Sequence, residues 1–91
     1  MKVKWSLPAF HDMQRIFQHI VQENPTAARE VMDEIYEGCE SLKTLPNRGR
    51  VGRTHGRREL VFPSLSYIAV YQVKEDSVEI VRIYHAAQNW S

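Results

Sequence analysis

Five arginines within residues 48–58 make this segment of the 91-residue chain the one best suited to binding an anionic group. The segment reads RGRVGRTHGRR, and its arginines are Arg48, Arg50, Arg53, Arg57 and Arg58. A guanidinium binds phosphate or carboxylate through paired hydrogen bonds, and the interspersed glycines allow close backbone approach. Three interpretations are open: contact with nucleic-acid phosphate, docking of an acidic partner or target, and a solvated surface.

A second group of reactive side chains stands near the end of the chain, in VEIVRIYH. It contains Arg82, Tyr84 and His85, which together could transfer a proton and hold a phosphate. Successive residues of a strand face opposite sides, so Arg82 and Tyr84 should share a face and His85 should not join them.

The pairing of this last strand depends on the turn that precedes it, residues 74–77. If the turn leaves Val73 opposite Val78, His85 lies on the face of Ile68, and the other two side chains lie on the face of Tyr67. A slip of one residue would change these faces.

Charge is distributed unevenly. Residues 41–58 hold six of the twelve Lys and Arg residues and none of the eleven Asp and Glu residues, so the rest of the chain carries −5 although the whole carries +1. This basic island would concentrate an anionic partner on one region. No apolar run reaches the roughly 18–20 residues that span a bilayer. The single cysteine, Cys39, cannot form an internal disulfide, so we expect a cytoplasmic protein without membrane contact.

The sequence contains no pattern typical of a metal or cofactor site. Zinc-ligand spacings, phosphate-binding glycine motifs and a Ser/His/Asp order are all missing. His11 and His19 lie two helical turns apart, too far to share a metal without other ligands. Cys39 lies on an apolar stripe and is expected in the core. We therefore expect no metal and no cofactor.

The elements that must position these residues follow from periodicity. Residues 1–5 alternate as a strand, and Ser6 is a suitable N-cap for an amphipathic helix of about four turns. Asn24 and Pro25 start a second helix that should run to about Leu45. Two helices so tightly joined form an antiparallel hairpin.

Three further strands are expected, at about residues 57–62, 66–73 and 78–85. The resulting order is β-α-α-β-β-β. The predicted fold class is α+β: one domain spanning residues 1–91, with a small twisted antiparallel sheet and the helix hairpin packed on one face.

The chain resembles the RelE/ParE superfamily, the toxins of bacterial type II toxin–antitoxin modules. The resemblance rests on the order and spacing of VKWS, ENPTAAREVMDEI, LKTLPNRGR, RREL, YIAVYQV and VEIVRIYHAAQNW. It implies a growth-arresting toxin with a cognate antitoxin that wraps it, and contact with operator DNA only through that antitoxin. It leaves the target open, because RelE-like members cut mRNA in the ribosomal A site and ParE-like members poison DNA gyrase.

The residue at position 68 bears on this choice. RelE-like nucleases resembling this chain carry an arginine where it has Ile68, and isoleucine cannot stabilise a pentavalent phosphate. ParE-like inhibition of gyrase is therefore favoured. A ribosome-dependent, metal-independent mRNA endonuclease is the alternative, and an inactive module member that only binds its partner is a third interpretation.

Each interpretation uses different residues. A nuclease would use His85 as acid or base with Arg82, Tyr84 and Arg53, although His85 could equally serve as a structural hydrogen-bonding group at the strand end. Docking of the antitoxin or target would use the five loop arginines together with Trp90.

Overall fold

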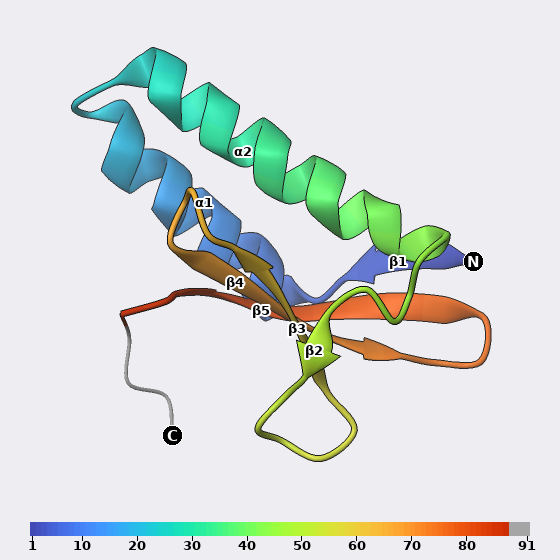
Figure 1. Cartoon of the computed structure of the whole chain (residues 1–91). Coiled ribbons are helices and arrows are strands. Elements are labelled where there is room, and N and C mark those ends of the chain that lie inside the picture. Colours follow the sequence, from blue (N-terminus) through green and yellow to red (C-terminus); the bar gives the residue numbers. More distant parts are fainter. Residues whose placement is uncertain (88–91) are drawn as a thin grey trace.

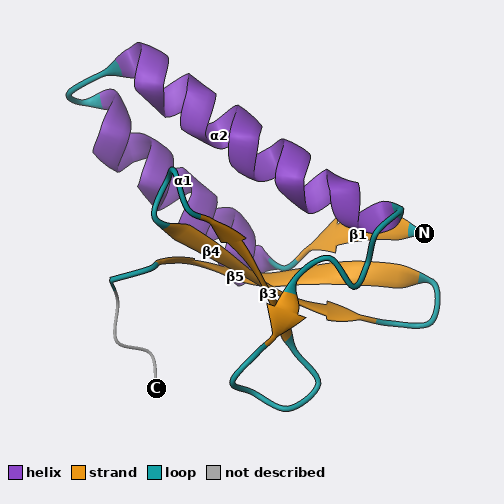
Figure 2. Ribbon diagram, viewed as in Figure 1, coloured by secondary structure: helices purple, strands orange, loops and turns teal. Residues whose placement is uncertain are grey.

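The computed structural model describes residues 1–87 and confirms the predicted fold class and element order (Figures 1 and 2). Trp90 lies outside the described residues. The elements are β1 (Lys2–Trp5), α1 (Leu7–Val21), α2 (Pro25–Glu40), the 3-10 turn η1 (Ser41–Lys43), β2 (Arg50–Val51), β3 (Arg58–Phe62), β4 (Tyr67–Val73) and β5 (Ser77–His85). The short strand β2, inside the arginine-rich segment, was not predicted.

Both helices begin at the predicted caps. Ala9 N donates to Ser6 Oγ at 3.1 Å, and Ala27 N donates to Asn24 Oδ1 at 3.0 Å. The end of α2 differs from the prediction, because the chain tightens into η1 directly after Glu40. There Ser41 Oγ donates to the carbonyl of Gly38 at 2.5 Å, a local bond that competes with continued helix.

The sheet has the strand order β1-β5-β4-β3-β2, and the helix hairpin covers one of its faces (Figure 2). The pairs β2–β3, β3–β4 and β4–β5 are antiparallel, and the antiparallel pairing of the last three strands was predicted. β1 differs in running parallel to β5, which makes the sheet mixed. Parallel neighbours need a long crossover, and the intervening helices and strands provide it.

A β-bulge in β5 changes the predicted faces. Val73 lies opposite Val78, as expected, but the pairing shifts at Val70/Tyr71 and leaves Val81 as an extra residue. One inserted residue reverses the facing of every position beyond it.

The predicted faces of the last strand were therefore wrong. His85 pairs with Tyr67, on the face that packs against the helices, and Tyr84 pairs with Ile68 on the other face. Arg82 pairs with Val70 and so remains on the opposite face from His85.

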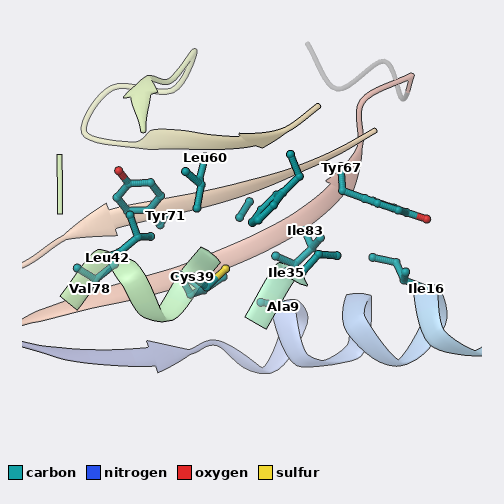
Figure 3. Packing of buried hydrophobic residues seen from close by; sticks show 13 residues of the cluster. Ala9, Ile16, Ile35, Cys39, Leu42, Leu60, Tyr67, Tyr71, Val78 and Ile83 are labelled. Carbon is teal, nitrogen blue, oxygen red and sulfur yellow. The ribbon is translucent and has the colours of Figure 1, made fainter. Parts of the chain in front are cut away.

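The hydrophobic core lies between the helix hairpin and the sheet, with Cys39 inside it as predicted (Figure 3). Gly38 brings α2 close to β3, because a methyl group at this position would overlap the ring of Phe62. The fully buried side chains include Ile35, Cys39, Leu42, Tyr71, Val78 and Ile80. Neither helix in residues 1–87 is long and apolar enough to cross a membrane.

Candidate functional site

The edge of β5 is completed by Ser6, the N-cap of the first helix, and by Asp12 within that helix. β1 stops pairing at Ile80, so beyond this residue β5 has a neighbouring strand, β4, on one side only. Ser6 supplies the first partners: its N–H donates to Ile80 O at 3.0 Å and its hydroxyl donates to Val81 O at 2.8 Å. Asp12 of α1 supplies the next, because Ile83 N donates to Asp12 Oδ2 at 2.9 Å.

Asp12 also fixes Arg82, the arginine singled out from the sequence. The Asp12 side chain is only 3% exposed, and it accepts from Arg82 Nε at 2.7 Å and Arg82 Nη2 at 3.0 Å. Arg15 Nη2 binds the same carboxylate. The hydrogen bond to Asp12 raises the pKa of the Arg82 guanidinium above its ordinary value. The Asp12 carboxylate therefore balances the charge of Arg82 and fixes the position of its guanidinium group.

The two other reactive residues of β5 lie beside it. The Tyr84 ring stacks under Arg82, whose Cζ is 5.1 Å from the ring centroid. His85 meets the ring of Tyr67 edge to face at 5.3 Å, and its Nδ1 accepts from Ala87 N at 3.2 Å. Burial raises the pKa of the Tyr67 phenol.

These side chains line one cavity of about 200 Å³ between α1 and the end of β5. Its lining comprises Asp12, Arg15, Ile16, His19, Tyr67, Arg82, Ile83, Tyr84 and His85. The structure thus brings together Arg82, Tyr84 and His85 in one cavity, although the alternation of side chains along a strand would place them on two faces of the sheet. They can meet because Arg82 lies at the edge of the sheet, from which its side chain reaches Asp12 on the helix side. The cavity is lined by two imidazoles, two phenols and two guanidinium groups, which can bind an anion or transfer a proton.

The arginine-rich segment is divided by the structure into two groups. The first group, Arg48, Arg50 and Arg58, donates hydrogen bonds to nearby backbone and side-chain oxygens. Arg58 donates three hydrogen bonds to carbonyls, to Gly49 O at 2.7 and 3.1 Å and to Asn47 O at 3.1 Å. Arg50 Nε binds the buried Glu59 carboxylate at 2.9 Å, and Arg48 Nη1 donates to Ser41 Oγ at 2.7 Å.

The second group, Arg53 and Arg57, lies in the turn that joins β2 to β3 and projects from the sheet (Figure 1). The turn is closed by Gly52 N donating to Arg57 O at 2.7 Å, and Gly56 has a φ of 80°, which favours glycine. Arg53 is exposed and Arg57 half-buried. Docking by the five arginines stays a prediction. Arg48, Arg50 and Arg53 are exposed, whereas Arg57 and Arg58 are half-buried.

His85 and the arginine turn lie at opposite ends of β4. His85 pairs with Tyr67, whereas Arg58, which follows the turn, pairs with Tyr71. Four residues along a strand correspond to about 13 Å. In the cavity His85 lies with Arg82, which a nuclease was expected to use, and with Arg15, whereas Arg53 belongs to the distant turn.

Four polar residues of the cavity were not predicted as site residues: Asp12, Arg15, His19 and Tyr67. Asp12 carried a signal in the sequence, since it stands on the same helical stripe as the buried Ala9 and Ile16. A carboxylate on an apolar stripe needs a partner when it is buried. The sequence offered Arg15, one helical turn further on, as a partner for the Asp12 carboxylate. The second partner, Arg82, could be found only from the folded chain.

Comparison with known proteins assigns the family. A family model described as the ParE toxin of type II toxin–antitoxin system, parDE, matches residues 3–90. The chain belongs to this family. The resemblance inferred from the sequence is thereby confirmed, and the protein is a toxin of the RelE/ParE superfamily.

Relatives of this ParE-family toxin carry names from both branches. It is 35% identical over 89 residues to Y4kP of Sinorhizobium fredii, covering 98% of this chain and 92% of that protein. It is 34% identical over 87 residues to Toxin RelE2 of Caulobacter vibrioides, covering 96% and 97%. Among solved structures, a chain of the chromosomal ParDE system from P. aeruginosa superimposes with a TM-score of 0.86 at 28% identity, covering 93% of this chain and 95% of that one.

Proposed function

We propose that this toxin arrests growth by inhibiting DNA gyrase and is neutralised by a cognate antitoxin. Gyrase is the target that the ParE-like resemblance implies. The likeness to the ParDE chain, with a TM-score of 0.86, supports this branch, since an isolated RelE toxin from E. coli reaches 0.62 with 13% identity. Solved relatives from P. aeruginosa and M. tuberculosis come from toxin–antitoxin systems, which supports a protein antitoxin as partner.

The observation that carries the proposal is the environment of Ile68. This side chain is 5% exposed and lies between Val61 of β3 and Tyr84 of β5 on the sheet face opposite the helices. A nuclease needs a cation here to stabilise the phosphate in its transition state. The arginine closest along β5, Arg82, is bound to the Asp12 carboxylate instead. This arrangement favours a binding protein over a phosphate-cleaving enzyme.

A supercoiling assay tests the proposal. Purified toxin is titrated against DNA gyrase and relaxed plasmid, with the toxin–antitoxin complex as the matched control. We expect the free toxin to block supercoiling or stabilise gyrase–DNA breaks, and the complex to do neither. Normal supercoiling at saturating toxin would remove the gyrase assignment.

The second candidate is a ribosome-dependent mRNA endonuclease. Two observations favour it: His85, Tyr84 and Arg82 line one cavity, and a relative at 34% identity is named Toxin RelE2. In this case His85 would act as acid or base. Incubation with ribosomes holding a defined mRNA should then cut the A-site codon, and His85→Gln should abolish cutting. His11→Gln, a change at an exposed histidine on α1, is the control and should cut normally.

We further propose that the antitoxin or target docks on the arginine-rich segment, with the exposed Arg48, Arg50 and Arg53 as its most accessible cations. Arg58, which donates to the carbonyls of Asn47 and Gly49, would act by holding the segment in shape. Trp90 stays a predicted contact from the sequence alone. Operator DNA would be contacted through the antitoxin.

A further inference from the structure

One buried carboxylate is shared by two guanidinium groups in the cavity beside β5. Asp12 accepts from Arg82 twice, from Arg15 once and from the backbone N–H of Ile83 once. Each carboxylate oxygen thus accepts two hydrogen bonds, which uses its capacity fully. Two positive charges face one negative charge, so the cluster keeps a net charge of +1.

The surplus charge is accessible. The Arg15 side chain is 64% exposed and that of Arg82 is 35% exposed. Within residues 1–87, Arg15 Nε and Nη1 and Arg82 Nη1 donate to no protein acceptor. Guanidinium N–H groups left over from one carboxylate are well placed to bind a second oxyanion.

The rest of the cavity suits an anion. Its other polar lining groups are His19, His85 and the phenols of Tyr67 and Tyr84, and Asp12 is the only acidic residue among the described lining. Histidine and tyrosine can donate hydrogen bonds to an anion. We propose that this cavity binds the carboxylate of an Asp or Glu side chain from a partner protein.

The surroundings favour a protein over a nucleic acid. A net charge of +1 matches a single carboxylate, whereas a nucleic acid strand is bound by several cations along its backbone. The neighbouring face of α1 carries an apolar groove of about 260 Å³ lined by Phe10, Met13, Phe17 and Met32, with Gln14 and Gln18. Such a surface accommodates apolar side chains of a peptide next to its acidic residue. The proposal stands whether the toxin's target is gyrase or the ribosome.

The four histidines of the chain provide a direct test. The full-length toxin is titrated with sodium acetate at fixed pH, ionic strength being kept constant with chloride, and the ring resonances of the histidines are followed by NMR. We expect saturable shifts for His19 and His85, which line the cavity. His11 and His55 lie elsewhere and should stay nearly unchanged. Equal shifts at all four histidines, or none that saturates, would overturn the proposal.

Two variants and a second probe complete the experiment. Arg15→Gln should weaken acetate binding about three- to five-fold, the effect of one partly exposed ion pair. Arg29→Gln removes the same charge from an exposed position on α2 and should leave binding unchanged. Amide spectra of both variants verify the fold. Unchanged binding in Arg15→Gln would contradict the proposal. Dimethyl phosphate, which mimics a nucleic-acid phosphodiester, should bind no tighter than acetate, and clearly tighter binding would overturn the assignment to a protein carboxylate.

Discussion

Asp12 of α1 and Arg82 of β5, seventy residues apart, are joined by two hydrogen bonds of 2.7 and 3.0 Å. The same carboxylate accepts the N–H of Ile83, so this contact fixes the first helix to the edge of the sheet. Asp12 is 3% exposed, which makes the pair sensitive to the loss of either partner.

Asp12→Ala should therefore lower the free energy of unfolding by about 2–3 kcal/mol, because it removes the acceptor of the Ile83 N–H and of the Arg82 and Arg15 guanidinium groups. Urea denaturation measures the change. Asp33→Ala, at an exposed position on α2, is the matched control and should stay within about 0.5 kcal/mol of the parent. Equal stabilities for the two variants would refute the structural role of the contact.

The two groups of loop arginines should respond differently to the loss of one charge. Arg58→Gln removes hydrogen bonds to the carbonyls of Asn47 and Gly49, so it should cost about 1–2 kcal/mol of stability. Arg53→Gln lies in the projecting turn and should change stability by less than about 0.5 kcal/mol. If docking uses this turn, Arg53→Gln should weaken capture by the antitoxin in a pull-down while its melting temperature is retained. Retained capture would argue against docking at this turn.

Gly38 should resist substitution although it lies inside a helix. Alanine normally stabilises a helix relative to glycine by about 1 kcal/mol. Here the added methyl group would overlap the Phe62 ring, and overpacking costs about 1–3 kcal/mol. Gly38→Ala should therefore destabilise the protein in thermal unfolding. Combining it with Phe62→Leu should cost less than the sum of the two single changes; an additive result would place the strain elsewhere.

Stability should fall at alkaline pH because of Cys39. Burial, with a smaller contribution from Glu40, raises the pKa of its thiol from 9.0 to about 12. Above pH 9 the unfolded chain releases the thiol proton and the folded chain keeps it, so folding loses up to about 1.4 kcal/mol per pH unit until the folded pKa is reached. The free energy of unfolding measured between pH 8 and 11 should show this slope, in addition to that of Tyr67, whose pKa is also raised by burial. In Cys39→Ala the part of the pH dependence that is due to the thiol should be absent. Identical pH slopes for the parent protein and Cys39→Ala would contradict the prediction.

Local sequence signals predicted the secondary structure well. Ser6 and Asn24 begin the helices because their side chains accept the first free N–H groups, an interaction confined to four neighbouring residues. The alternating pattern of residues 66–73 predicted β4, and the order and spacing of the quoted sequence segments predicted the family. Cys39 was placed in the core from its position on an apolar stripe.

Only the tertiary structure decided which chemical groups meet. The bulge at Val81 reversed the facing of His85, because a single extra residue changes every later position in a strand and carries no sequence signature here. The cavity likewise depends on α1 packing beside the open edge of β5, which joins Asp12 to Arg82 across seventy residues. The arginine cluster is evident in the sequence, but the hydrogen bonds of Arg58 to the backbone and of Arg50 to Glu59 exist only in the folded chain.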